Sequence, residues 1–154
     1  GRAKVDVERE RLKDINPEIE IEARRIFYTP ESASEFDFSR YDYVVDAVDN
    51  VTAKIDIICR CKEAGVPVIS SMGTGNKLDP LAFKVSDIED TKVCPLAKIV
   101  RKELRKRGIR GIKAVYSEEE PVNTGGRARA SISFVPSAAG LLIASEVIKD
   151  LIKK

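Results

Sequence analysis

The spacing of apolar residues in the middle of the chain predicts a strand, a helix and a second strand in succession. Residues 43–48 (YVVDAV) form a short apolar run that ends at Asp49 and Asn50, where helical spacing begins. A short apolar run followed by a helix is typical of an interior strand of a parallel sheet. A helix over residues 51–64 and a strand over residues 66–72 follow, and such a β-α-β unit has a right-handed crossover.

The remaining pattern predicts further helices and strands around this unit. The segment EIEIEAR, residues 18–24, alternates apolar and charged positions, which predicts a strand near a sheet edge. Gly65 and Gly108 are expected to close their helices. The other predicted helices span residues 3–15, 95–107 and 136–153, the other strands span 82–87, 112–117 and 131–135, and residues 31–42 form a short helix or an irregular connector. This alternation indicates an α/β fold, expected as a Rossmann-like, three-layer mixed sheet.

The composition indicates a single soluble domain. The chain has 154 residues, of which 43% are hydrophobic and 34% are charged, and this length can bury a sizeable core. No apolar run approaches the roughly 18 residues that a membrane span needs, and no signal peptide is visible. A cytoplasmic protein without a membrane partner is therefore expected. The formal net charge is only +2, but Lys and Arg gather between Lys98 and Lys113.

Histidine is absent, which excludes the most common general base and the most common zinc ligand from this chain. Nucleophile pairs of the serine–histidine or cysteine–histidine type are excluded with it. The three cysteines, Cys59, Cys61 and Cys94, form no C-x-x-C pair, and a structural zinc ion needs four ligands at closer spacing. No zinc is expected, and an odd number of cysteines is typical of a reducing compartment.

Asp49 stands where a bound nucleotide or its metal is expected. In open α/β sheets the ligand lies outside the carboxyl ends of the strands, and a carboxylate there can hold Mg²⁺ against phosphates. The alternative is that Asp49 or Asn50 only caps the following helix, as both residue types often do. Position alone leaves both roles open.

Two other charged residues occupy unusual places. Asp46 lies inside an apolar strand, where a carboxylate needs a partner or loses its charge. It can contact a ligand or satisfy buried backbone groups. Lys4 lies in the first turn of the first predicted helix, where a cation opposes the helix dipole unless an anion lies nearby. An exposed surface lysine is the simpler alternative.

A helix in the second half of the chain carries a basic face. Its members are Lys98, Arg101, Lys102 and Arg105. Such a stripe can follow the phosphates of a nucleic acid, and the lack of an interleaved aromatic residue favours backbone contact over base readout. A solvated helix face beside Glu103 is the alternative.

Seven sequence blocks carry a resemblance to a known enzyme family. They are GRAKV, INPEIEIE, YDYVVDAVDNVTAK, VPVISSMGTGNKLDP, CPLAKIVRKELRKRG, VYSEEEP and SISFVPSAAGLLIASEVIKDL, and they cover almost the whole chain. Together they resemble the ThiF/MoeB/HesA superfamily, which is related to the ubiquitin-activating enzymes. Within it, the blocks are most similar to those of the tRNA threonylcarbamoyladenosine dehydratases.

The resemblance implies ATP-dependent adenylation of a carboxylate, followed in the dehydratase branch by cyclising dehydration of threonylcarbamoyladenosine in tRNA. It implies ATP and Mg²⁺ as cofactors and makes Lys4 and Asp49 catalytic, with Lys4 at the phosphates and Asp49 on magnesium. Asp46 matches a position beside the nucleotide. Lys98, Arg101 and Arg105 would then contact tRNA. The family is dimeric, so the apolar final helix is expected to bury a homodimer interface or the sheet face, and a sulfur-relay protein is a possible partner.

The family's glycine-rich turn, its ribose-binding acid and its triphosphate arginines would all lie before Gly1. Residues 1–154 are therefore expected to be the C-terminal portion of an adenylating domain whose nucleotide-binding β-α-β half is missing, and to be inactive alone. The zinc-binding cysteine pairs of the sulfur-carrier-activating relatives are also missing, which favours the dehydratase branch. Activation of a ubiquitin-like sulfur carrier, with Cys94 as acceptor, remains an alternative. A non-catalytic dimerisation or binding module is another.

Overall fold

Four strands form one sheet in the order β1-β2-β4-β3. The structure is a computed structural model that describes residues 1–122, 125 and 130–153. The strands are β1 Val44–Asp46, β2 Val68–Ser71, β3 Phe83–Asp87 and β4 Lys113–Ser117. β1, β2 and β4 run parallel, and β3 runs antiparallel to β4. The predicted mixed sheet is confirmed.

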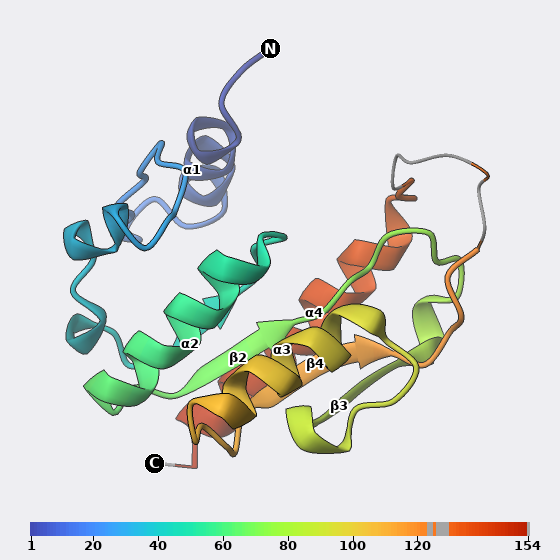
Figure 1. Ribbon diagram of the computed structural model, residues 1–154. Coiled ribbons are helices and arrows are strands. Elements are labelled where there is room, and N and C mark those ends of the chain that lie inside the picture. The colour runs from blue at the N-terminus through green and yellow to red at the C-terminus, as the bar shows by residue number, and fades with distance from the viewer. Residues whose placement is uncertain (123–124, 126–129, 154) are drawn as a thin grey trace.

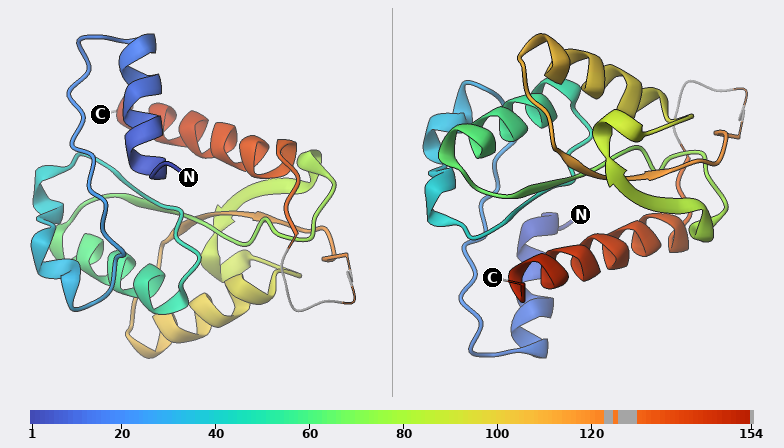
Figure 2. Two further views of the ribbon diagram at one scale, coloured as in Figure 1. Left: turned by 90° about the horizontal axis from the view of Figure 1, so that it is seen from above. Right: turned by 90° about the horizontal axis from the view of Figure 1, so that it is seen from below.

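Helices cover both faces of the sheet and make three layers (Figure 1). The helices are α1 Lys4–Ile15, α2 Val51–Ala64, α3 Pro95–Lys106 and α4 Phe134–Leu151, and short 3-10 helices are η1 Ser32–Glu35, η2 Phe38–Arg40, η3 Pro80–Ala82 and η4 Ile88–Asp90. Helices α2 and α3 lie on one face, while α4 and α1 lie on the other (Figure 2). Within the described part of the chain, no helix has the length and apolarity to cross a lipid bilayer.

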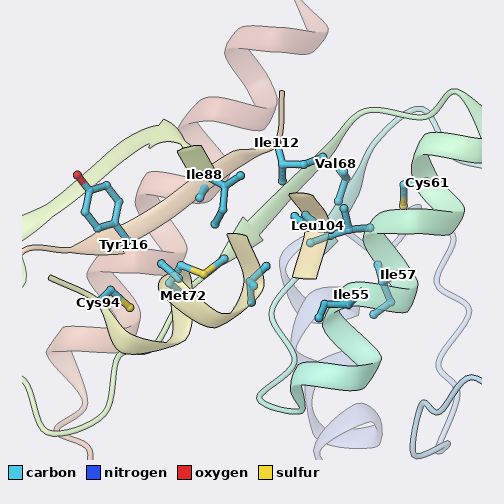
Figure 3. Packing of buried hydrophobic residues seen from close by; sticks show 14 residues of the cluster. Ile55, Ile57, Cys61, Val68, Met72, Ile88, Cys94, Leu104, Ile112 and Tyr116 are labelled. Carbon is cyan, nitrogen blue, oxygen red and sulfur yellow. The ribbon is translucent and has the colours of Figure 1, made fainter. Parts of the chain in front are cut away.

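The larger core lies between the sheet and the helices α2 and α3. Figure 3 shows Ile57 and Cys61 of α2 packing near Val68 of β2 and Leu104 of α3. The smaller core, on the α4 side, consists of Ile69, Val115, Ala139 and Ile143. Because successive strand residues point to opposite faces and both faces are covered, the central strands read as continuous apolar runs.

The ends of α2 are set by local sequence. The Asn50 side chain accepts a hydrogen bond from the Ala53 amide at 3.0 Å and caps the first turn. Gly65 ends the helix with φ +70°, a left-handed conformation that glycine adopts without a steric penalty. The predicted boundaries of this helix are confirmed at both ends.

The strand predicted over residues 18–24 is wrong, since that segment forms no ladder within the described chain. A strand exists only where a neighbouring backbone completes its hydrogen bonds, and β1 pairs with β2 alone. The Arg24 guanidinium instead bonds the Glu22 carboxylate and the Glu35 carbonyl, each at 2.5 Å. The alternation of apolar and charged side chains therefore does not show whether a neighbouring strand is present to pair with the backbone.

The strand predicted over residues 131–135 is also wrong, because α4 begins at Phe134. Val135 is fully buried and its amide bonds the Ile132 carbonyl at 3.1 Å, which starts the turn. Pro136 fits the first helical turn, where its missing N–H costs no intrahelical hydrogen bond. The apolar run SISFV suits a strand or a helix start, and tertiary packing selects the helix.

Candidate functional site

A hollow opens where β1 and β2 end, against the first half of α4. It measures about 170 Å³. The lining residues are Ala47, Val48 and Asp49 after β1, Ser71, Met72 and Thr74 at the end of β2, and Pro136, Ala139, Gly140 and Ile143 of α4. Both strands present their carboxyl ends here, which is where open α/β sheets bind ligands. The hollow is the candidate functional site.

Asp49 is exposed on the rim between β1 and α2. The neighbouring Asn50 caps α2, so the helix does not need the Asp49 carboxylate as a cap. Among the described residues no hydrogen bond or ion pair engages that carboxylate. Asp49 is therefore free to bind a ligand at the edge of the hollow.

The donor set around Asp49 suits one kind of metal. No group of three or more His, Cys, Asp or Glu side chains within the described ranges could hold an ion. Mg²⁺ keeps several waters and binds through one or two carboxylates plus substrate phosphates, rather than in an all-protein cage. A single exposed carboxylate at the carboxyl end of a strand fits Mg²⁺ delivered with a polyphosphate.

Behind the hollow lies a buried polar network centred on Lys54. The Lys54 ammonium donates to Asp46 Oδ2 at 2.6 Å, to Ser70 Oγ at 3.3 Å and to the Ser71 carbonyl at 2.9 Å. Ser70 Oγ also donates to Asp46 Oδ2 at 2.5 Å, and the Val48 amide donates to Asp46 Oδ1 at 3.2 Å. Asp46 is 1% exposed and does not line the hollow. Its carboxylate thus serves protein partners.

Strand register and helix position together build this network. Asp46 and Ser70 are direct partners in the β1–β2 ladder, so their side chains share one face. Helix α2 crosses that face and places Lys54, with no exposed surface, over both. Burial lowers the pKa of the Lys54 ammonium, while the charge and hydrogen bond of Asp46 and the charge of Asp49 raise it. The lysine is an uncommon fully buried cation.

Sequence reasoning missed Lys54 and Ser70. One signal could have found the lysine: it interrupts the apolar face of α2 between Val51, Ile55 and Ile58, eight positions after Asp46. A lysine on a buried helix face needs an anionic partner. The serine carries no such signal, because its role depends on strand register.

Lys4 is exposed at the first position of α1 and does not line the hollow. Among the described residues it has no hydrogen-bond or ion-pair partner. Helix α1 buries none of its residues. The structure thus leaves Lys4 available to an anion but does not bring it together with Asp49 and Asp46.

The basic face of α3 divides into paired and free cations. Arg101 donates to the Ile88 carbonyl at 3.3 Å, and to the carbonyl and hydroxyl of Thr91 at 2.8 Å and 2.6 Å. Arg105 forms an ion pair with Glu89 through its Nε at 2.7 Å. Both arginines therefore tie α3 to η4.

Lys98 and Lys102 are exposed, and neither has a hydrogen-bond or ion-pair partner within residues 1–122, 125 and 130–153. They are four residues apart and so share one side of α3. These two lysines are the free charges of the predicted basic stripe. Lys102 lies on the predicted basic face but is not among the residues predicted to contact tRNA.

Cys94 lies outside the main hollow. It is 4% exposed at the N-cap position of α3 and lines a separate depression with Gly73 and Lys77. The preceding Val93 has φ +60°, which is unusual for a β-branched residue. Cys59, Cys61 and Cys94 are all free thiols.

Comparisons with known proteins agree with one another. The ThiF family matches residues 1–154. The chain is 40% identical over 171 residues to the tRNA threonylcarbamoyladenosine dehydratase of Bacillus subtilis, covering 99% of the chain and 67% of that protein. Its identity to the Escherichia coli protein of the same description is 32% over 127 residues, covering 77% of the chain and 47% of that protein.

Solved structures show the same likeness. The E. coli tRNA N6-threonylcarbamoyladenosine dehydratase in complex with ATP is similar to the chain with a TM-score of 0.90 and 29% identity, covering 99% of the chain and 65% of that structure. The complex with AMP gives a TM-score of 0.89 and 28% identity, with the same coverage. The chain thus spans about two thirds of the length of that enzyme. The similarity extends over all three layers of the fold.

Proposed function

The chain belongs to the ThiF family, and from this premise we propose that it takes part in ATP-dependent adenylation of a carboxylate. The relatives that it matches are tRNA threonylcarbamoyladenosine dehydratases, and one is solved with ATP. The proposed substrate is the carboxylate of a threonylcarbamoyl group on a tRNA adenosine. The proposed location is the cytoplasm.

The observation that carries the proposal is the free Asp49 carboxylate at the carboxyl ends of two parallel strands. In the first step a carboxylate oxygen of the substrate bonds to the α-phosphorus of ATP, and pyrophosphate leaves. In the second step the acyl group closes into a ring and AMP leaves. Mg²⁺, held by Asp49, would neutralise the phosphate charge, and the protein's contribution is positioning and electrostatics. This chemistry needs no histidine.

Lys4 and Asp46 would act differently from each other. Lys4, exposed and without a partner among the described residues, is proposed to contact the phosphates. Asp46 is buried, and both of its oxygens accept hydrogen bonds from the protein. We therefore assign Asp46 to holding the loop beside the nucleotide, not to direct contact.

The proposed tRNA contact is the basic side of α3. Lys98 and Lys102 are free to meet phosphates, whereas Arg101 and Arg105 are engaged with η4. Phosphate contacts release counterions, so tRNA affinity should fall steeply as salt rises. A homodimer is proposed through α4, whose exposed apolar residues are Phe134, Leu141, Ile148 and Leu151.

The test is mass spectrometry of the modified nucleoside after the full-length protein has been incubated with ATP, Mg²⁺ and tRNA carrying threonylcarbamoyladenosine. Loss of one water from the nucleoside, with release of AMP, is expected. Asp49→Asn should lower the rate by about 100-fold or more, because a metal-binding carboxylate is lost. Asp42→Asn is the matched control, since Asp42 is exposed at the opposite end of β1. A nucleoside of unchanged mass with the wild-type protein would refute the proposal.

The second candidate function is activation of a ubiquitin-like sulfur carrier, which the position of Cys94 beside a depression favours. Cys94→Ser separates the two functions. The dehydratase proposal expects Cys94→Ser to retain nucleoside dehydration. A sulfur-carrier role expects a thioester on Cys94, formed when the thiol attacks the acyl-adenylate of the carrier and AMP leaves; intact-mass measurement detects it, and it is lost in the serine variant.

A further inference from the structure

The Lys54 ammonium joins the ends of the two strands that form the floor of the hollow. One of its three protons reaches Asp46 at the end of β1, and another reaches the Ser71 carbonyl at the end of β2. The third reaches Ser70. An ammonium has three donors, so the group is fully satisfied and has none left for a ligand.

The contacts with Asp46 and with the Ser71 carbonyl continue into the lining of the hollow. Through its other oxygen, Asp46 accepts the Val48 amide, one residue before Asp49. Ser71 itself lines the hollow and leads to Met72 and Thr74. The position of the loop that carries Asp49 is thus coupled to the position of the β2 end through a single buried cation.

The fold alone does not call for a charge at this position. Helix α2 buries Ala53, Ile55 and Ile58 around Lys54, and apolar residues in place of both Lys54 and Asp46 would avoid the desolvation of an ion pair. Burial also lowers the pKa of Lys54, because desolvation disfavours the charged ammonium, and the charge and hydrogen bond of Asp46 oppose this effect. Buried ion pairs in some proteins fix one arrangement among several.

We propose that Lys54 is a positioning residue for the phosphate and metal site: through Asp46 and the Ser71 carbonyl it holds the Asp49 loop and the β2 end at a fixed separation. This role rests on the proposed function, in which Asp49 binds the magnesium ion of a polyphosphate. Lys54 itself touches no ligand. Groups that orient a metal ligand from behind commonly change metal affinity by about 10–100-fold when they are removed.

The test uses the full-length protein and compares Lys54→Met with Lys113→Met. Lys113 also lies in an ion-pair cluster, with Asp150 at 2.6 Å and Glu146 at 3.1 Å, but at the amino end of the sheet. The readout is the Mg²⁺ concentration that gives half-maximal binding of ATP, measured by calorimetry without tRNA. For Lys54→Met it should rise by about tenfold or more, while Lys113→Met should leave it within about twofold of the wild type because the metal ligand is undisturbed.

A second readout concerns the protein without metal. The backbone amide resonances of Val48 and Asp49 should shift or broaden in Lys54→Met and stay in place in Lys113→Met. The double variant Lys54→Met with Asp46→Asn, which leaves no unpaired buried charge, takes the place of Lys54→Met if the single variant does not fold. It also removes the link between the two strand ends, so the half-maximal Mg²⁺ concentration should rise in the same direction.

The two proposals fail in different ways. If the wild-type protein binds no ATP with Mg²⁺, the proposed function is overturned, and the positioning role with it. If the wild type binds and Lys54→Met, or the double variant with Asp46→Asn in its place, requires the same Mg²⁺ concentration as Lys113→Met, the positioning role alone is overturned. A raised Mg²⁺ requirement together with shifted Val48 and Asp49 amides supports it.

Discussion

Lys54 Nζ lies 2.6 Å from Asp46 Oδ2, and neither side chain has any exposed surface. The pair links helix α2 to strand β1 across the face that bears the larger core. The pair lies at the carboxyl end of β1, next to the hollow, and not in the middle of the sheet. The same contact therefore stabilises the fold and holds the lining of the hollow in place.

The first prediction concerns the stability that this pair provides. Lys54→Met should lower the free energy of unfolding by about 3–5 kcal/mol, because it leaves the Asp46 carboxylate buried without its cation. Urea denaturation of the full-length protein measures the change. The double variant Lys54→Met with Asp46→Asn should recover part of the loss, since it removes the unpaired charge. A single variant within about 1 kcal/mol of the wild type would contradict this account.

The second prediction separates the structural and RNA-binding cations of α3. Arg101→Ala should cost about 1–3 kcal/mol of stability, because buried acceptors on Ile88 and Thr91 lose their donor. Lys98→Ala should change stability by less than about 0.5 kcal/mol. Thermal unfolding measures both.

The salt dependence of tRNA binding tests whether the free lysines of α3 contact phosphates. Lys98→Ala should reduce the slope of log affinity against log salt by about 1, as expected for one lost phosphate contact. Lys102→Ala should do the same, and Glu103→Ala, on the same helix, should leave the slope no smaller. An unchanged slope in both lysine variants would remove this face from the tRNA interface.

The third prediction concerns the stability of the fold at low pH. The hydrogen bond from the Lys113 ammonium holds the pKa of Asp150 below its ordinary value of 3.8, and a second hydrogen bond from Tyr43 adds to this. A carboxylate with a lowered folded-state pKa contributes stability that is complete above its unfolded pKa and is lost as pH falls through the folded one. The free energy of unfolding should therefore fall below about pH 4.

Asp150→Asn tests the source of that loss. The variant should be less stable than the wild type at neutral pH, and the difference should shrink as pH falls below the ordinary Asp pKa. Thermal melts across the pH series measure it, with Asp42→Asn as a surface control. A difference that stays constant down to the lowest pH would show that Asp150 does not contribute through its charge.

The fourth prediction concerns the exposed face of α4. Leu141 is 75% exposed and Ile148 is 59% exposed, and their spacing of seven residues puts them on one side of the helix. If this face joins two copies, Ile148→Asp should convert the full-length dimer to a monomer in light scattering. Ile99→Asp on α3, across the sheet, should leave the dimer intact. A wild-type protein that is monomeric at all concentrations would rule out the proposed interface.

The sequence was most informative where short-range physics decides the outcome. An apolar run, the Asn50 cap and Gly65 define β1, α2 and the turn after it, and each works within a few residues. The position of Asp49 at the end of a strand followed from the same local pattern. The family resemblance, carried by blocks along the chain, agrees with the comparisons.

Sequence reasoning failed where a backbone partner or a packed surface made the decision. Residues 18–24 alternate as a strand does but have no neighbouring strand in the described chain. Phe134 and Val135 have strand-like side chains but begin α4, because Val135 is buried there. The strand propensity of a segment does not show whether a neighbouring strand or a packing surface is present.

The sequence by itself thus determined the α/β pattern, the absence of histidine chemistry and an acid at the carboxyl end of β1. Only the tertiary structure decided which cations are free and what lies behind Asp49. Asp46 meets Ser70 through strand register, and Lys54 reaches both only because α2 crosses back over the sheet. Those contacts join residues up to 24 positions apart, and the desolvated site where they meet exists only once the layers have packed.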